Sequence, residues 1–498
     1  MSPTAAATPA PAAAGLAPRP LLAIALLALA ARLAFVLAFP FGGGDWDVYA
    51  TVAENILRGC GVSLSDPAGP ACVPHFGGNQ GPGYPVFVAL VWAASGHSDM
   101  AVRLVQTALA ALAIAYLADA AARAAARPAV GVAAGLVLAA SPLAVAWPRY
   151  TQTETLALAA TIWVLAELLR SLAAGRLRIA ALGAALIAAT FIRLDAILLA
   201  VPVAVAALAL HGVRQGLARG AAVALVLALP WAAWTARNLA VGLPRLTPTD
   251  MVMPADAPSP LGYLAWTRTW ITKEYQRPGA LWPINRFVYS AISIDPTAYD
   301  GPGEQARIEA LLAGLARHDG APIPAAIDDA FRAIAAERAA RAPLRTWLAN
   351  PLRRALALWS NPFSSFGWPN ELPAGAASHA ERLQIAEGGI AGKLALARAH
   401  PWRAATKALT GGYRYLLLVA FLAAALAAAL WRGMDAPARR LAGCAAGFVV
   451  ARTLVLAWIG NIETRYTAAL APAMEVAVVL VAAASLAAWQ RRPRPRGA

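Results

Sequence analysis

Residues 42–85 read GGGDWDVYATVAENILRGCGVSLSDPAGPACVPHFGGNQGPGYP, a turn-rich stretch in a largely apolar chain. Asp45 and Asp47 stand near its start, shortly after the first long hydrophobic run ends at Pro40. Behind them, in DVYATVAENILRG, apolar residues recur at helical spacing. We interpret this segment as a short amphipathic helix on a membrane surface, with two carboxylates at its start. Carboxylates at the edge of a membrane helix are candidates for chemistry rather than packing.

The composition is that of a polytopic membrane protein. The chain has 498 residues, of which 59% are hydrophobic and 14% charged, against about 45–50% and about 25% in soluble domains. Several apolar runs reach the roughly 20 residues that a membrane-spanning helix needs. A net charge of +16 would suggest nucleic acid in a soluble protein. Here the basic residues lie in short loops and at the C-terminus, so they are topology signals and nucleic acid is not an expected partner.

Hydropathy predicts an all-α protein with about ten transmembrane helices. The run at 84–95 is too short to cross, so we expect it to be an interfacial or re-entrant helix. The spans are expected at 20–40, 101–122, 128–147, 153–173, 177–193, 195–211, 219–242, 413–431, 438–459 and 465–489.

Short-loop arginines set the orientation, with both termini cytoplasmic. Four fall on the outer side: Arg58, Arg149, Arg193 and Arg465. Fifteen fall on the cytoplasmic side: Arg19, Arg123, Arg127, Arg170, Arg176, Arg178, Arg214, Arg219, Arg432, Arg439, Arg440, Arg491, Arg492, Arg494 and Arg496. Because cytoplasmic loops collect Lys and Arg, this asymmetry fixes the topology and supports the number of spans.

The predicted organisation follows from these spans. Residues 1–19 form a disordered cytoplasmic tail and 490–498 a basic cytoplasmic tail. Residues 20–242 form the main transmembrane module, whose first outer loop is 41–100. Residues 243–412 are an outer helical insert, and 413–489 the C-terminal spans.

The insert is expected to cap the outer face rather than to form a separate free domain. It begins Pro-rich at 244–260 and then shows helical patterns near 303–316, 326–340 and 343–360. Tryptophan favours the bilayer interface. Seven of the sixteen Trp fall in the insert: Trp266, Trp270, Trp282, Trp347, Trp359, Trp368 and Trp402.

This topology gathers the polar landmarks at one face. The outer ends of spans carry Asp45, Arg149, Tyr150, Glu154, Arg193, Asp195, Glu463, Arg465 and Tyr466. Within the spans, Arg32, Arg237 and Arg452 lie in the half nearer that face, and Glu475 near the middle of the last helix. Charge within a membrane usually faces a cavity or a partner, so one charged outer chamber is predicted. The alternative for a single arginine is snorkelling to the headgroups.

Cys60 and Cys72 lie in the same outer loop, where a disulfide would persist. Such a bridge would stabilise the loop by roughly 3 kcal/mol, and two free thiols are the alternative. No HExxH or paired-His spacing is present, so no metal cofactor is expected. A divalent site built from acids such as Asp45, Asp47 and Glu154, or from His75, stays open.

Short motifs occur in order along the chain. They are Asp45 with Tyr49 four residues later, AENILRG (53–59), GPGYPVFVAL (81–90), RLVQTALA (103–110), SP (141–142), TQTETLAL (151–158), FIRLDAIL (191–198), PWAAWTARN (230–238) and ETRYTAALAP (463–472). This set resembles the bacterial branch of the GT-C membrane glycosyltransferases. Relatives in that superfamily include protein O-mannosyltransferases, lipid A aminoarabinose transferases and lipopolysaccharide galacturonosyltransferases.

The resemblance implies a GT-C fold in a bacterial inner membrane and a mannosyltransferase-like enzyme. It implies transfer of a hexose or pentose from a polyprenyl-phosphate donor on the extracytoplasmic face. The acceptor would be an envelope molecule such as lipid A or lipopolysaccharide, a protein or a glycan. The family's catalytic acid matches Asp45, because Tyr49 follows it at the family's spacing. Here Trp46 precedes the second acid, so the division of roles between Asp45 and Asp47 stays open.

These roles agree with the chemistry. Displacement at an anomeric carbon needs a carboxylate to take the acceptor's proton and cations to hold the departing phosphate. Arginine can bind phosphate oxygens through two N–H groups. The candidates are Arg193, Arg465 and Arg237, with Arg149 and Tyr466 as further donors. Other residues expected to bind substrate are Tyr49, Tyr150 and Glu463. Glu154 and Asp195 would orient the sugar or an arginine, or simply cap or pair, and Asp45 and Asp47 could simply begin a helix.

Three other classes of protein are alternatives. A transporter or lipid-linked sugar flippase would share the many spans, but it typically has midplane sites and inverted repeats. An envelope polysaccharide polymerase or ligase would more naturally place its chemistry in the large insert. A non-catalytic membrane scaffold is the third alternative.

Overall fold

The computed structural model describes residues 15–41, 44–75, 81–243, 259–361, 364–369 and 388–491. Apart from two isolated bridges, Phe41–Tyr150 and Ser63–Pro74, these residues form helices, turns and irregular chain. This confirms the expected all-α fold. The tail at 1–14, the Pro-rich stretch 244–258 and the basic residues Arg492, Arg494 and Arg496 lie outside the described residues.

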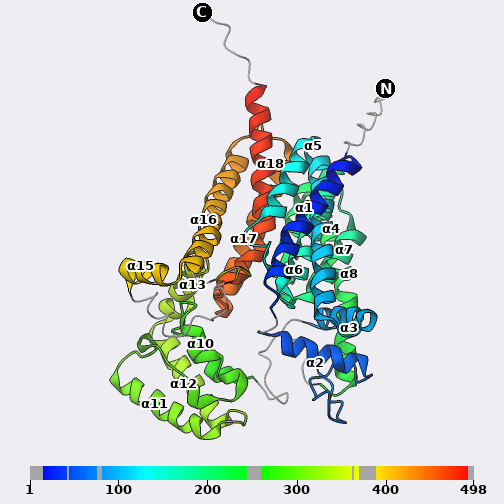
Figure 1. Cartoon of the computed structure of the whole chain (residues 1–498). Coiled ribbons are helices and arrows are strands. Elements are labelled where there is room, and N and C mark those ends of the chain that lie inside the picture. The colour runs from blue at the N-terminus through cyan, green and yellow to red at the C-terminus, as the bar shows by residue number, and fades with distance from the viewer. Residues whose placement is uncertain are drawn as a thin grey trace, which may run out of the picture.

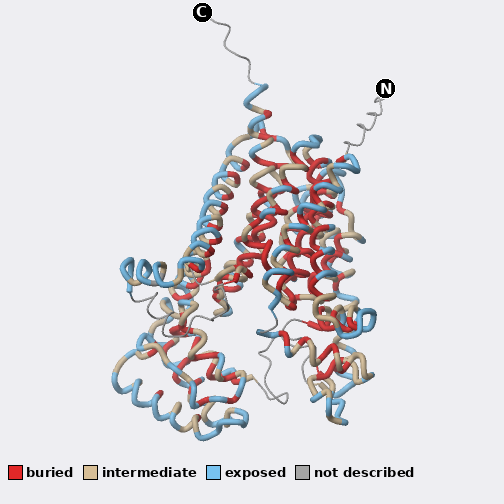
Figure 2. The backbone as a smooth tube through the Cα atoms, viewed as in Figure 1, coloured by how far each residue is buried: buried red, intermediate tan, exposed pale blue. Residues whose placement is uncertain are grey.

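Apolar helices form one bundle (Figure 1). They are α1 (Pro18–Ala38), α4 (Asp99–Ala125), α5 (Pro128–Ala140), α6 (Glu154–Ala173), α7 (Ile179–Ile192), α8 (Ala200–Ala240), α16 (Pro401–Leu430), α17 (Ala436–Ile459) and α18 (Ala471–Gln490). Within the described residues, seven helices are long and apolar enough to cross a membrane. Buried residues concentrate in the middle of this bundle (Figure 2).

Each of the ten predicted spans contains a helix, but four of them differ from an isolated crossing helix. α5 and α7 have 13 and 14 residues, shorter than a full crossing requires. α5 ends early because Ser141 precedes a proline and adopts an extended ψ of 115°. α8 contains two predicted spans joined at Gly212, whose φ of 70° suits glycine alone. The number of crossings therefore stays a prediction.

The first outer loop folds into two short helices, α2 (Trp46–Leu57) and α3 (Gly83–Ser95). Trp46 and Tyr49 of α2 pack against Tyr84 of α3 in a small separate core. Gly83 allows the start of α3 to rest on the end of α7, because a Cβ there would lie 2.6 Å from the carbonyl oxygen of Phe191. The GPGYP motif therefore serves close packing.

The chain between α2 and α3 is tied back to α2. A disulfide joins Cys60 and Cys72. Arg58 donates to the carbonyls of Pro67 and Gly69. Asn55 donates to two further carbonyls of the same loop. The loop below the two acids is thus held by covalent and polar contacts.

The insert comprises α9 (Leu261–Arg268), α10 (Gln276–Leu281), α11 (Pro302–Leu315), α12 (Ala325–Arg341), α13 (Asn350–Ser360) and α15 (Gly389–Ala399). The expected patterns near 303–316, 326–340 and 343–360 are helical, the last including a π-helical turn at Arg345–Ala349. α2, α3 and α9–α13 lie at the end of the bundle opposite the start of α1 and the end of α18 (Figure 1).

Two details of the insert correct the sequence interpretation. Trp266 and Trp270 are not interfacial, because they are buried with Phe331 in a core that the insert shares with the end of α17. Hydropathy could not distinguish a tryptophan in this core from one in a headgroup layer. The C-terminal spans start earlier than expected, because α16 begins at Pro401, twelve residues before the predicted boundary at 413.

The expected disordered tail also ends earlier than predicted. Leu16 is buried, and its backbone N–H donates to Asp119 Oδ1 of α4 at 3.1 Å. α1 then begins at Pro18. Residues 15–19 are therefore folded onto the bundle, because a buried carboxylate accepts a backbone N–H there.

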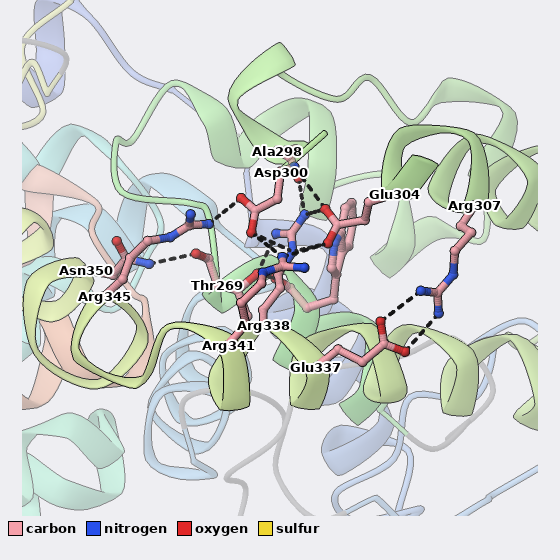
Figure 3. Close-up of polar contacts among 11 residues, drawn as sticks. Thr269, Ala298, Asp300, Glu304, Arg307, Glu337, Arg338, Arg341, Arg345 and Asn350 are labelled. Atoms are coloured by element: carbon pink, nitrogen blue, oxygen red, sulfur yellow. Dashed lines mark hydrogen bonds and ion pairs between the residues drawn. The ribbon is translucent and has the colours of Figure 1, made fainter. Parts of the chain in front are cut away.

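An ionic network holds the insert together (Figure 3). Arg338 is 1% exposed and donates to Glu304, to Thr269 Oγ1 at 2.7 Å and to the carbonyl of Ala298. Asp300 accepts from the neighbouring Arg341 at 2.7 Å. The network joins α9, α11 and α12, which are far apart in sequence.

We expect Arg338→Met to destabilise the insert by about 2 kcal/mol, because it leaves buried acceptors without a charged donor. Arg307→Met is the matched control, since its pair with Glu337 is about half exposed and such pairs contribute little. Limited proteolysis of the purified protein measures both. Equal protease resistance of the two variants would contradict this account.

Candidate active site

The predicted outer residues meet where several helices end. Asp45 is the N-cap of α2, and Glu154 is the first residue of α6. Arg193 directly follows α7. Glu463 precedes the 3-10 helix η9 (Thr464–Leu470), which leads into α18. The chain leaves regular membrane-spanning helix at these points, so polar side chains can gather here outside the hydrocarbon-facing surface.

Arg193 lies in the middle of the cluster. It pairs with Asp195 through two contacts of 3.2 Å and with Glu154 Oε1 at 3.5 Å. It also donates to Thr153 Oγ1 at 3.0 Å. Its guanidinium lies 5.2 Å from the ring centre of Tyr466. The TQTET, FIRLD and ETRY motifs therefore converge on this one side chain.

Asp195 is shared between two arginines. Arg452 of α17 contacts Asp195 Oδ2 at 2.6 Å and donates to the carbonyl of the same residue. Arg452 is 2% exposed. The sequence placed Arg452 near the outer face but assigned it no partner. Its partner carboxylate shows that it does not snorkel to the headgroups.

Arg465 faces the more open side of the cluster. Its Nε contacts Glu463 Oε2 at 2.5 Å, and its Nη1 lies 3.8 Å from Glu154 Oε1. Glu463 is also bound by Arg277 of α10, at 2.8 Å. Burial would raise the pKa of Glu463, but the guanidinium groups of Arg465 and Arg277 outweigh it and hold the pKa below its usual value. Glu463 is thus a carboxylate at neutral pH.

Asp45 faces these charges from the start of α2. Its side chain stays accessible, yet the surrounding protein limits its hydration and raises its pKa. Arg465 acts in the opposite direction, while the negative charges of Glu154 and Glu463 raise the pKa further. Asp47, in the first turn of α2, is exposed. Asp45 therefore has the electrostatic setting of a proton acceptor.

Tyr49 forms the wall beside Asp45. Its ring packs edge-on against Tyr84, with centroids 5.0 Å apart. Burial, with the charges of Asp45 and Glu154, raises the pKa of Tyr49 well above its usual value. Tyr49 therefore keeps its proton and can act as a hydrogen-bond donor at neutral pH.

Gln106 explains one of the weak motifs. Its Nε2 donates to the carbonyls of Pro148 and Tyr150, and its Oε1 accepts from Tyr84 OH. This buried amide holds the chain between α5 and α6 in place. The Gln of RLVQTALA is thus a scaffold for the site.

Three predicted binding residues have mainly structural contacts. Arg149 donates to the carbonyls of Gly367 and Phe39, and to Tyr150 OH at 2.7 Å. Tyr150 also packs against the ring of Phe41. Arg237 donates to carbonyls of the first outer loop, including that of His75 at 2.7 Å. Substrate binding by these residues stays a prediction.

Two residues of the insert reach the site without any prediction from sequence. Arg277 binds Glu463 and donates to Asn461 Oδ1 at 2.7 Å. Glu274 accepts from the backbone N–H and Oγ1 of Thr464. Burial raises the pKa of Glu274, although the Thr464 hydrogen bond opposes this. The sequence signal that could have indicated these residues is the polar run TKEYQR (272–277) in the insert.

Four arginines of the cluster are matched by four acids, and Glu274 of the insert adds a fifth acid beside them. The cations are Arg193, Arg277, Arg452 and Arg465, and the four matching anions are Asp45, Glu154, Asp195 and Glu463. Each buried charge thus has an opposite neighbour, as a low-dielectric site requires. Within the described part of the chain, no group of three His, Cys, Asp or Glu could hold a metal ion.

The chain is similar to a family model and to a solved structure. Residues 79–234, which include α3 to α7 and most of α8, match the model of the dolichyl-phosphate-mannose-protein mannosyltransferase family. Over these residues the chain is similar to the GT-C mannosyltransferases. The chain also aligns with the crystal structure of ArnT from Cupriavidus metallidurans bound to undecaprenyl phosphate. The identity is 15% and the TM-score 0.37, over 96% of this chain and 81% of that one. No curated protein matches the chain.

Proposed function

We propose that this protein transfers a monosaccharide from a polyprenyl-phosphate donor to an envelope acceptor. The reaction takes place on the extracytoplasmic face of a bacterial inner membrane, and Asp45 is the general base. The matching family is named for a donor of this kind, dolichyl-phosphate mannose. The fifteen-to-four arginine asymmetry supports an outward-facing site. The organisation into a catalytic module, an outer helical insert and C-terminal spans belongs to the same proposal.

The position of Asp45 carries this proposal. Its accessible carboxylate begins α2 and faces the Arg465 and Glu154 pair. A raised pKa makes a carboxylate a better base, since the optimal catalytic pKa lies nearer the operating pH. Helix initiation alone does not account for Asp45, because its side chain accepts no cap hydrogen bond.

The reaction balances as a single displacement. Asp45 takes the proton of the acceptor hydroxyl while that oxygen forms a bond to the anomeric carbon. The bond between this carbon and the phosphate oxygen breaks on the opposite face, which inverts the configuration. The electron pair leaves with polyprenyl phosphate. Positive charge aimed at that phosphate lowers the barrier.

Arg465 is the cation best placed to receive the phosphate. Its side chain is 32% exposed, whereas that of Arg193 is 7% exposed. Arg193 has all its described contacts within the site, and therefore orients Glu154 and Asp195. Arg465 can exchange its Glu154 contact, 3.8 Å long, for a phosphate oxygen, because guanidinium binds phosphate through two N–H groups.

The test is transfer by purified protein in proteoliposomes. Radiolabelled sugar is supplied either on polyprenyl phosphate or on a nucleotide, with extracted envelope glycolipids, protein or glycan as acceptors. We expect label to enter an acceptor only from the lipid-linked donor. Movement of the labelled lipid across the bilayer without transfer would favour the flippase alternative and would overturn the proposal.

The pH dependence of transfer gives a further prediction. A base must be deprotonated, so activity is present above the pKa of Asp45 and is lost as pH falls through it. Glu463→Gln removes a negative charge that raises the pKa of Asp45. It also frees Arg465 from its ion pair with Glu463, and the positive charge of Arg465 lowers the pKa of Asp45. We therefore expect the acid limb of the rate profile to move to lower pH. An unchanged limb would contradict the electrostatic account of Asp45.

A further inference from the structure

Residues 271–277, here called the latch segment, run from the chain after α9 into the first turn of α10 and bind the chain around the start of η9. Arg277 Nη1 contacts Glu463 Oε1 at 2.8 Å and Asn461 Oδ1 at 2.7 Å. Glu274 Oε2 accepts from Thr464 Oγ1 at 2.7 Å. The insert and the membrane bundle therefore meet at the residues that flank Arg465.

The latch segment is itself held in shape. Gln276 Oε1 accepts the backbone N–H groups of Thr272 and Lys273. Arg354 of α13, which is 2% exposed, donates to the carbonyl of Ile271 at 2.8 Å and to that of Ala457 of α17. A segment bound at both ends presents Arg277 in a defined place, as a positioning group requires.

We infer that Arg277 is a positioning residue for the proton acceptor, acting on Asp45 through Glu463 and Arg465. The inference rests on the proposed function and extends it to the insert. No described contact joins Arg277 to Asp45 directly. Glu463 binds both arginines at once, at 2.8 Å and 2.5 Å, and Arg465 in turn acts on the charge of Asp45.

The direction of the effect follows from electrostatics. Without the Arg277 guanidinium, Glu463 keeps its full negative charge near Asp45 and holds Arg465 more strongly. Both changes disfavour the ionised form of Asp45. Removal of Arg277 must therefore raise the pKa of Asp45, whereas removal of Glu463 must lower it.

The experiment is a double-variant cycle with Arg277→Gln and Glu463→Gln. The acid limb of transfer should move up by roughly half a pH unit in Arg277→Gln, the size expected for one lost charge beside a partly hydrated site. In the Glu463→Gln background, Arg277→Gln should cause little further change. Arg277→Lys should restore much of the profile, and Arg307→Gln, on the far side of the insert, should match wild type.

A second measurement reads Asp45 without turnover. Carbodiimide modifies protonated carboxyl groups, and mass spectrometry gives the pH midpoint for modification of Asp45. We expect the same upward shift of this midpoint in Arg277→Gln. No shift in that variant, or a full shift that persists without Glu463, would overturn the inference. Absence of transfer by wild type would instead overturn the proposed function, while the labelling midpoints still decide the role of Arg277.

Discussion

Asp45→Asn is expected to reduce sugar transfer by about 10²–10⁴-fold, the usual contribution of a positioned general base. The amide has nearly the same shape but cannot take the acceptor's proton. Because the Asp45 side chain accepts no helix-cap hydrogen bond, α2 should still form. Turnover of a polyprenyl-phosphate donor in proteoliposomes measures the loss, and donor binding measured separately should be retained.

Asp47→Asn is the matched control, two residues along the same helix. Asp47 is exposed in the first turn of α2, where a carboxylate favours the helix N-terminus by only a few tenths of a kcal/mol. We expect near-normal transfer. If only Asp47→Asn were inactive, the base would be Asp47 and the family's catalytic acid would match two residues later in this chain.

Arg193→Gln is expected to destabilise the protein by about 3–5 kcal/mol, the range for removal of one partner from a buried ion pair. The Arg193 side chain is 7% exposed and contacts two carboxylates and a hydroxyl. Without Arg193, the remaining cation paired with Glu154 is Arg465 and the one paired with Asp195 is Arg452. The unfolding transition in mixed micelles, followed by tryptophan fluorescence, measures the change.

Two further variants show whether charge is the cause. The double variant Arg193→Gln with Asp195→Asn removes one charge of each sign and should recover part of the stability. Arg332→Gln on α12 removes an arginine whose side chain is 53% exposed and should unfold close to wild type. A loss of stability in Arg332→Gln equal to that in Arg193→Gln would contradict the argument.

Much of the membrane architecture could be predicted because hydrocarbon imposes one requirement on every span. Backbone groups in the bilayer must bond within their own helix, so long apolar runs become helices. Each of the ten predicted segments contains a helix, and two of them form the two halves of α8. The run at 84–95 was predicted to be a short non-crossing helix, and α3 has 13 residues.

Segments outside the apolar spans were harder to place. α5 was expected to continue to 147 but ends at Ala140, because the pre-proline Ser141 outweighs hydropathy. The insert's tryptophans were assigned to an interface, although Trp266 packs at the centre of a core. Tryptophan is common both in protein cores and in headgroup layers, so only the packing partners of a tryptophan show which of the two it occupies.

By itself, the sequence determined that this is a multi-helix membrane protein and that a set of acids and arginines lies at the same ends of its spans. Those conclusions depend on hydropathy and charge, which can be read from short segments of the chain without knowledge of distant contacts. The tertiary structure alone decided the pairs: Arg193 with Asp195 and Glu154, Arg452 with Asp195, and Arg277 with Glu463. Arg277 and Glu463 lie 186 residues apart. Such a contact exists only after the insert packs on α17, since local propensity carries no information about distant charge partners.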